Sequence, residues 1–280
     1  MTISDSSPRY LRLLSIAGSD SGGGAGIQAD LKTFAALGCY GMTALAALTA
    51  QNTRGVTAIH PVPASFLKAQ LQAVLDDIGA DAVKIGMLHS PEMVEVVAWA
   101  IDQYQLQRVV LDPVMVATSG DRLMAVETVQ VLVDQLFPRA TVVTPNLDEA
   151  VLLLGRSVDS VETLEPAVAD LLALGAPAVL LKGGHLPGDA VVDLLGQRDG
   201  SRQPWHSARI ATHNGHGTGC TLSSAIAVYL AKGFELTEAV GQARTYIRGA
   251  IQAGASVHTG HGHGPLNHGF APLPMQVLGV

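Results

Sequence analysis

The chain has 280 residues, of which 48% are hydrophobic and 15% are charged, a composition typical of a folded globular protein rather than of a disordered one. Its formal net charge is −7 at pH 7, so it has no surplus of basic residues to neutralise the phosphates of a nucleic acid or of an anionic membrane. We therefore expect neither a nucleic-acid partner nor a membrane partner.

Cysteine usage and the N-terminal segment indicate the compartment. Cys39 and Cys220 form no CxxC pair and no zinc-binding spacing, which favours free thiols. The first 14 residues include Asp5 and lack the apolar run of a secretory signal. Two uncharged runs, 33–53 and 210–231, approach the length of a membrane span, but polar residues and glycine interrupt both, and we interpret them as buried core. The sequence thus predicts a cytoplasmic protein.

From the N-terminus onward, short apolar runs alternate with longer amphipathic segments. The first half predicts strands at residues 11–18, 42–53, 56–62 and 82–88, and helices at 27–38, 63–79 and 90–104. The third of these helices begins with Ser90 and Pro91, which are typical of a helix start. The second half predicts strands at 108–115, 140–146, 178–185, 191–195 and 205–210. Its helices are predicted near 125–135 and at 146–155, 161–175, 219–232 and 237–253.

This alternation predicts the fold class. Apolar strands that alternate with helices are typical of a mostly parallel sheet with helices on both faces, a three-layer α/β fold. No repeat or linker divides the chain, so we expect a single domain over residues 1–280. Polar segments follow several predicted strands, at 18–26, 50–55, 84–87, 112–115, 144–149, 182–185 and 212–220. Because ligands bind beyond the carboxyl ends of such strands, we expect these seven segments to form one site.

The common nucleotide-binding signatures do not fit the chain. None of its lysines follows a glycine, so no Walker A loop is present. Residues 24–29, GAGIQA, match the dinucleotide-binding pattern G-x-G-x-x-A, but no acidic residue lies between Asp30 and Asp76 to hold a ribose hydroxyl. The glycine-rich segment 18–26 still indicates a close approach of backbone to a ligand, or else a flexible turn.

Residues 215–220, GHGTGC, precede an apolar helix and indicate an anion site. Helix N-termini present unpaired N–H groups, and Gly217 and Gly219 leave room for a phosphate. In the first turn, Cys220 is either a thiol whose pKa the helix lowers or a small apolar residue at a packed helix start. Lys182 ends an apolar strand, where a phosphate would balance its charge.

Two acidic residues at strand ends could hold Mg²⁺ that bridges nucleotide phosphates. Asp112 ends a predicted strand, and Glu149 lies in the first turn of a predicted helix, where it could alternatively stabilise the helix start alone. The C-terminal segment holds four further histidines, but no carboxylate or cysteine lies close to them, so we expect a loose loop rather than a metal site; they are His258, His261, His263 and His268.

Taken in order, the motifs resemble those of the hydroxymethylpyrimidine/phosphomethylpyrimidine kinases of thiamine biosynthesis, members of the ribokinase-like superfamily. The resemblance runs from IAGSDSGGGAGIQADLKTF through ALTAQNTRGV, KIGML, VVLDPVM, TPNLDEA, LLKGGH and HGTGCTLSSAIA to GHGPLNH, nearly the whole chain. It implies transfer of the ATP γ-phosphoryl group to a pyrimidine hydroxymethyl group and then to the resulting monophosphate, with Mg²⁺, in a homodimer.

The resemblance also implies a role for individual residues. Asp30 and Gln51 would hydrogen-bond the aminopyrimidine, in a pocket shaped by Gly18, Met87 and Val114. Asn146, Glu149 and Thr212 would serve ATP and its Mg²⁺. The amides of Gly217, Thr218, Gly219 and Cys220 would form the anion hole, Lys182 would contact phosphate, and Cys220 would help to deprotonate the attacking oxygen.

One motif departs from the family pattern, and two alternatives remain. Asp20, Ser21 and Gly22 stand where the family commonly carries Asp-Pro-Ser, which predicts a looser first loop. Pyridoxal-type kinases share the fold and parts of the motifs, so a pyridoxal kinase or a dual kinase is the alternative enzyme. A nucleotide-sensing or dinucleotide-binding module is the alternative without catalysis.

Overall fold

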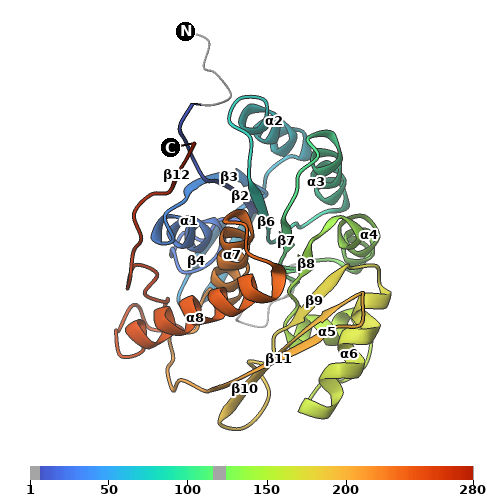
Figure 1. Cartoon of the computed structure of the whole chain (residues 1–280), viewed down its shortest axis with the longest axis vertical. Coiled ribbons are helices and arrows are strands. Elements are labelled where there is room, and N and C mark those ends of the chain that lie inside the picture. The colour runs from blue at the N-terminus through green and yellow to red at the C-terminus, as the bar shows by residue number, and fades with distance from the viewer. Residues whose placement is uncertain (1–6, 116–123, 280) are drawn as a thin grey trace.

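Eight strands of the described part of the chain form one central sheet (Figure 1). The structure is a computed structural model that describes residues 7–115 and 124–279, so the start of the segment judged for a secretory signal lies outside it. Across the sheet the strands are β11 (Arg202–Ala208), β10 (Ala190–Gln197), β9 (Ala178–Leu181), β8 (Val142–Val143), β7 (Val109–Leu111), β6 (Ala82–Ile85), β2 (Arg12–Ala17) and β3 (Tyr40–Leu45).

Most of the sheet is parallel and covered on both faces. From β9 to β3 all neighbouring strands pair in parallel, and β6 to β9 are buried along their whole length, as strands covered on both faces are. At one edge of this sheet, β10 pairs antiparallel with β9 and with β11.

Helices cover both faces of the sheet. One face carries α2 (Ala64–Leu75), α3 (Pro91–Gln103), α4 (Val126–Leu136), α5 (Leu147–Leu154) and α6 (Val161–Ala173), with a 3₁₀ turn at Phe137–Arg139. The other face carries α1 (Gly26–Ala36), α7 (Thr218–Ala231) and α8 (Leu236–Gly254), which lie in front of the sheet in Figure 1. The three-layer, mostly parallel fold expected from the sequence is confirmed.

Helix α7 is buried because it packs between other elements. It contacts β2, β6 and β7 on one side and α1 and α8 on the other. Its residues from Thr221 to Val228 are all buried, which explains its lack of a polar face. The packing fixes the helix start at the carboxyl ends of the central strands.

The predicted strand 42–53 is wrong in one respect, because it forms two strands. The chain leaves the sheet at Ala46, and residues from Ala47 onward form β4 (Ala47–Asn52), which pairs antiparallel with β5 (Gly55–Pro61). The N–H of Ala46 donates to Ala17 O at 2.9 Å, and the N–H of Ser19 donates to Ala47 O at 2.9 Å. These bonds direct the β4–β5 ribbon over the end of β2. The sequence also missed the short pair β1 (Arg9–Tyr10) and β12 (Val277–Leu278).

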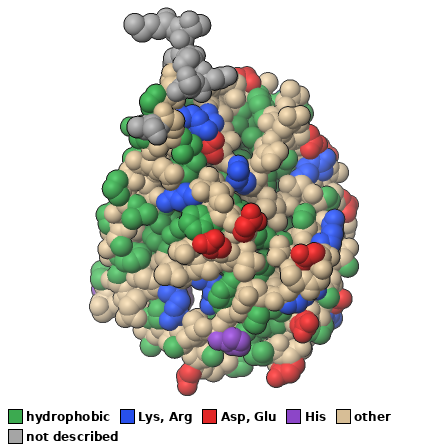
Figure 2. Space-filling model, viewed as in Figure 1, with side chains coloured by type: hydrophobic (Ala, Val, Ile, Leu, Met, Phe, Trp, Pro, Cys, Tyr) green, Lys and Arg blue, Asp and Glu red, His purple; other side chains and the backbone are tan. Residues whose placement is uncertain are grey.

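On the face seen in Figure 2, positive and negative side chains are interspersed among hydrophobic and uncharged ones. Among the described residues, no helix combines the length and the apolar character that crossing a membrane requires.

Candidate active site

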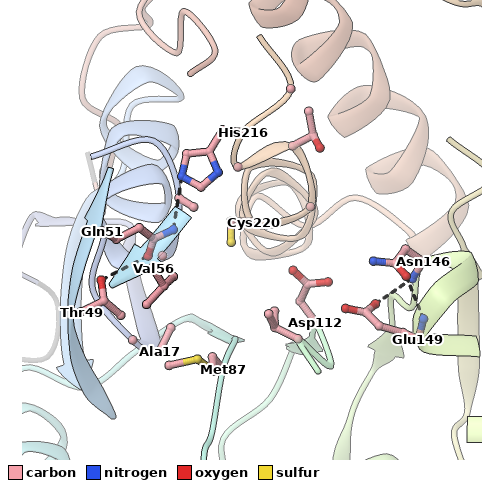
Figure 3. A pocket seen from close by; sticks show the side chains of 18 of the residues that line it. Ala17, Thr49, Gln51, Val56, Met87, Asp112, Asn146, Glu149, His216 and Cys220 are labelled. Carbon is pink, nitrogen blue, oxygen red and sulfur yellow. Dashed lines mark hydrogen bonds between the residues drawn. The ribbon is translucent and has the colours of Figure 1, made fainter. Parts of the chain in front are cut away.

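A cavity of about 400 Å³ opens at the carboxyl ends of the parallel strands (Figure 3). Each of the seven polar segments predicted to converge contributes lining residues, so the prediction of one site is confirmed. A second cavity of about 460 Å³ adjoins the first; the residues lining both are Asn146, Lys182, His185, Gly215, Thr218 and Gly219.

The end of the cavity under the β4–β5 ribbon has the features of a ring-binding pocket. Met87 and Val114 line it, together with Gln51 and Val56 from the ribbon. A Cβ atom at Gly18 would lie 2.7 Å from Met87 Cε, so the Met87 side chain packs directly against the backbone of Gly18. Gln51 points into the cavity in Figure 3 and contacts the Thr49 hydroxyl at 3.1 Å.

The start of α7 forms the middle of the cavity. Gly217 is the N-cap, with φ of 86°, and a Cβ atom there would collide with Gly24 O. The N–H of Thr218 donates to Gly215 O at 3.3 Å, and the N–H groups that follow it in the first turn have no partner within the helix and can bind an anion. A Cβ atom on Gly219 would lie only 3.2 Å from Lys182 Nζ, so the ammonium group lies beside these amides. Backbone donors and a positive charge thus meet where the sequence predicted an anion site.

Cys220 lies between the two ends of the cavity, with its sulfur facing the interior (Figure 3). Burial raises the pKa of its thiol to about 11, although the ammonium group of Lys84 and the N–H of Gly26 act in the opposite direction. The pKa of Cys220 is therefore shifted in the direction opposite to the lowering expected of a thiol at a helix start.

The far end of the cavity carries the acidic residues. Asn146 and Glu149 form a capping box at the start of α5, with Asn146 Oδ1 accepting from Glu149 N and Glu149 Oε2 accepting from Asn146 N. Burial raises the pKa of Glu149 to about 7; Lys182 opposes this rise and the carboxylate of Asp112 adds to it.

Asp112 and Lys182 form an ion pair of 2.8 Å between the anion site and Glu149. Burial disfavours the charge of Asp112, but the ammonium groups of Lys182 and Lys84 outweigh it and hold its pKa below the ordinary value. Thr144 and Ser223 donate hydrogen bonds to the same carboxylate, at 3.1 and 3.3 Å. Lys182 therefore has a partner before any phosphate binds, which corrects the view that only a ligand could balance it.

Asp30 is absent from the cavity wall, so its predicted contact with a ring is not supported. Its side chain is fully buried and forms an ion pair with Lys84 at 3.0 Å. Ser15 and Ser224 donate to its two oxygens, at 2.5 and 2.7 Å. Of this cluster of Asp30, Lys84, Ser15 and Ser224, only Lys84 lines the cavity.

Thr212 lines the second cavity and does not reach the first. Its hydroxyl donates to Ala255 O at 2.9 Å and accepts from Asn214 N at 3.0 Å. Both bonds hold the loop before α7, so the hydroxyl of Thr212 is already engaged within the protein.

Sequence reasoning missed His216 and Asp20. His216 lines the cavity, and its Nε2 lies 2.8 Å from Asp20 Oδ2. Both residues belong to segments that were singled out, 212–220 and 18–26, but attention to their glycines left the two polar side chains unexamined.

The C-terminal histidines do not gather into a metal site. No group of three or more His, Cys, Asp or Glu side chains suited to a metal ion occurs within residues 7–115 and 124–279. The segment is better held than a loose loop, because Gly262 and His263 donate backbone hydrogen bonds to Thr53 in the β4–β5 turn. His268 is buried against the Thr221 hydroxyl at 2.9 Å, and burial lowers its pKa to about 4.

Comparisons with known proteins agree with this geometry. The family model of phosphomethylpyrimidine kinase matches residues 20–267. A hydroxymethylpyrimidine/phosphomethylpyrimidine kinase of Rhizobium meliloti is 52% identical over 258 residues, 91% of this chain and 96% of the relative. A protein of the same name from Escherichia coli is 45% identical over 93% of this chain and 98% of its own length.

Solved structures show the same fold. A phosphomethylpyrimidine kinase of Clostridium difficile, 43% identical, superposes with a TM-score of 0.76 over 86% of this chain and 99% of its own. Pyridoxal kinase of Bacillus subtilis in an ADP complex, 40% identical, gives 0.85 over 93% of this chain and 98% of its own. The match covers most of the chain in both sequence and structure, and the chain therefore belongs to the phosphomethylpyrimidine kinase family, with its ribokinase-like fold.

Proposed function

We propose that the protein transfers the γ-phosphoryl group of ATP to the hydroxymethyl group of 4-amino-5-hydroxymethyl-2-methylpyrimidine and then to the resulting monophosphate. The observation that carries this proposal is the order of groups along one cavity. A ring-sized pocket with Gln51 lies at one end, the α7 amides and Lys182 lie in the middle, and Asn146 and Glu149 lie where the second cavity begins. An acceptor and a nucleotide can therefore approach the anion site from opposite sides.

The residues of the cavity would contribute by orienting the two reactants and by stabilising the charge on the transferred phosphoryl group. Phosphoryl transfer needs little covalent chemistry from a protein, so orientation and stabilisation of charge provide most of the rate. The amides of Gly217 to Cys220 would donate to the transferring phosphoryl group, and Lys182 would shift from Asp112 toward it. The second cavity, bordered by Thr212, would hold the nucleotide.

Mg²⁺ fits the acidic end of the cavity. Asp112 and Glu149 are both buried there, and their mutual repulsion contributes to the raised pKa of Glu149, which a bound cation would relieve. The two carboxylates would hold Mg²⁺ together with phosphate oxygens and water, and the ion would neutralise charge on the phosphates.

The pyridoxal alternative has support from structure. Pyridoxal kinase of Staphylococcus aureus, solved with AMP-PCP and pyridoxal, is 34% identical with a TM-score of 0.84 over 93% of this chain and 94% of its own. Higher identity to relatives named as pyrimidine kinases, up to 52%, supports the pyrimidine as the preferred acceptor.

The deciding experiment is ATP turnover with the pyrimidine alcohol, its monophosphate and pyridoxal side by side. We expect the highest kcat/KM for the two pyrimidines. A higher value for pyridoxal would overturn the substrate assignment, and no turnover of ATP with any acceptor would favour a binding module instead.

The remaining expectations about the molecule are also proposals. Free Cys39 and Cys220 support a cytoplasmic location, and the continuous helical cover of the sheet supports action as a single domain. A homodimer is proposed by analogy with the family and is tested by the mass of the protein in solution.

A further inference from the structure

The loop after β9, residues 183–189, presents a histidine where the two cavities meet, and the proposed mechanism does not use it. His185 lines both cavities; among the described residues, the other side chains that do so belong to Asn146, Lys182 and Thr218. Lys182 already pairs with Asp112, and the Asn146 side chain caps α5. His185 is therefore a polar group at this junction that still lacks a role.

The backbone around His185 is held in place, although it forms neither a helix nor a strand. The Arg209 guanidinium donates to Gly184 O at 2.7 Å and to Gly188 O at 2.9 Å. It also donates to the carbonyl group of Leu186, whose side chain is buried. None of these contacts involves the imidazole, so the loop presents His185 at the junction without depending on its side chain.

Asp148 determines which nitrogen of this imidazole remains for a ligand. It lies in the first turn of α5 and lines the first cavity, and its Oδ2 lies 3.0 Å from His185 Nδ1. A carboxylate can only accept a hydrogen bond, so Nδ1 carries a proton and donates it. Within residues 7–115 and 124–279, no group of the protein forms a hydrogen bond with Nε2. This second nitrogen is thus the one that a ligand can reach.

The second phosphorylation brings an additional anion to the junction. The first acceptor offers a hydroxyl group, whereas the second offers a phosphate monoester and is longer by that group. Because this phosphate must attack the γ-phosphoryl group, two phosphate groups meet in the second reaction, each with a charge of about −1.5 to −2. The α7 amides and Lys182 are placed to bind one of them, so the other needs a further donor.

We propose that His185 binds the phosphate group of the monophosphate acceptor, and that Asp148 is the positioning residue that orients its imidazole. With a proton on each nitrogen, the ring donates from Nδ1 to Asp148 and from Nε2 to a phosphate oxygen. Negative groups on both sides of the ring stabilise this charged form. His185 thereby favours phosphate monoesters over alcohols as acceptors, an assignment that rests on the proposed function.

Binding of phosphate to His185 can be tested without turnover. In ¹⁵N-histidine-labelled protein that holds AMP-PCP, inorganic phosphate should shift the His185 Nε2 resonance to that of a protonated nitrogen. Comparison with His185→Ala assigns the resonance. Inorganic phosphate is the probe because its binding does not depend on the identity of the acceptor ring. A resonance that inorganic phosphate leaves unchanged would overturn the proposal, whatever the enzyme phosphorylates.

Kinetics with the two acceptors provide the second test. We expect His185→Ala to raise KM for the pyrimidine monophosphate roughly tenfold, the factor for one hydrogen bond to a charged group, and KM for the alcohol by less than about twofold. His185→Gln, which keeps an N–H donor, should show a smaller rise. The matched control is His206→Ala, an exposed histidine outside both cavities. Tm of His185→Ala should equal that of the control, because Arg209 holds the loop without the imidazole.

The pattern across the two acceptors separates phosphate binding from a general disturbance of the site. An equal rise in KM for both acceptors, or an unchanged KM for the monophosphate, would overturn the proposal. If the unmodified enzyme phosphorylates neither acceptor, the proposed function fails, while the response of His185 to inorganic phosphate still decides whether this residue binds phosphate.

A double-mutant cycle tests the role of Asp148. Asp148→Asn should raise KM for the monophosphate in the unmodified enzyme. In a His185→Ala background it should not, because no imidazole remains to be oriented. A rise of the same size in both backgrounds would show that Asp148 acts independently of His185 and would overturn its assignment as a positioning residue.

Discussion

At the scale of single residues, Cys220 should matter differently for the two phosphorylation steps. The hydroxymethyl group must lose a proton as it attacks, whereas a phosphate monoester, with a second pKa of about 6, is already an anion at neutral pH. We expect Cys220→Ala to lower kcat with the alcohol roughly a hundredfold or more, and with the monophosphate by much less. Steady-state rates with both acceptors at saturating ATP measure the difference.

If Cys220 is the base, its raised pKa predicts that the rate with the alcohol depends on pH. Because the pKa is about 11, the thiolate fraction rises with pH throughout the neutral and mildly alkaline range. In the unmodified enzyme, kcat/KM for the alcohol should rise with pH between about 7 and 9, and Cys220→Ala should lose that rise. Turnover of the alcohol by Cys220→Ala near the unmodified rate would exclude Cys220 as the base.

Glu149 should reduce the stability of the ligand-free protein at alkaline pH. Its folded pKa of about 7 lies above the ordinary value of 4.5, so the folded state binds the proton more tightly than the unfolded state. Stability is therefore highest below the ordinary value and falls as pH rises toward and past 7. Glu149→Gln keeps the capping box and should raise Tm by several degrees at pH 8 but little at pH 4.5.

Thermal unfolding with and without Mg²⁺-ATP checks the prediction for Glu149. Thermal unfolding of both variants at the two pH values tests the stability effect, and Mg²⁺-ATP should stabilise the unmodified protein more than Glu149→Gln. A lower Tm for Glu149→Gln at pH 8 would contradict the assigned charge balance.

At the scale of elements, the start of α7 depends on one backbone conformation. Gly217→Ala would introduce a Cβ atom into Gly24 O at a φ of 86°, so the loop must move and the anion site with it. We expect a loss in kcat of roughly a hundredfold or more, comparable to the removal of an oxyanion donor. The matched control is Gly233→Ala after the other end of α7, which has φ of 90° and nothing within 4 Å of the added atom. It carries only the conformational cost of about 1 kcal/mol. Equal activity of the two variants would show that the collision is harmless.

The elements themselves follow largely from the sequence. Runs such as AVLL at β9, which are apolar on both faces, can only be buried strands in such a fold, and Ser90 with Pro91 marks the start of α3. The division of residues 42–53 into β3 and β4 could not be read in this way. Both pieces are strands by composition, and the break at Ala46 coincides with two bonds to the end of β2 and the start of the glycine-rich loop, Ala46 N to Ala17 O and Ser19 N to Ala47 O.

The sequence predicted which segments would converge on the site, but it did not predict the position of every side chain within them. Strand ends converge by topology alone, which is why Lys182, Glu149 and Gly219 line one cavity. Asp30 lies one turn into α1, beyond Gly26, and its buried side chain pairs with Lys84 instead of lining the cavity. Which face of the helix a residue occupies decides this, and the motif alone does not show it. His216 gave no periodic signal, because it is held by a contact with Asp20 across 196 positions of chain.

At the scale of the whole molecule, the buried pair of Asp30 and Lys84 joins four elements. It connects α1 to β6, and through Ser15 and Ser224 it also ties β2 and α7, directly beneath the cavity. Breaking a buried pair leaves one charge without a partner in a medium of low dielectric constant, at a cost of about 3–5 kcal/mol. The pair therefore determines how the central strands and the anion helix are held together.

Asp30→Asn should consequently lower stability rather than act on substrate binding. We expect Tm to fall by about 10 °C, with KM for the pyrimidine unchanged in the protein that remains folded.

Asp102→Asn is the matched control, since it breaks an exposed ion pair with Arg139 and should cost less than about 1 kcal/mol. The double change Asp30→Leu with Lys84→Met, which removes both charges at similar volume, should recover much of the lost stability. Thermal unfolding and steady-state kinetics on the same preparations measure both quantities. A large rise in KM with Tm unchanged would restore Asp30 to the ring-binding role that its motif suggested.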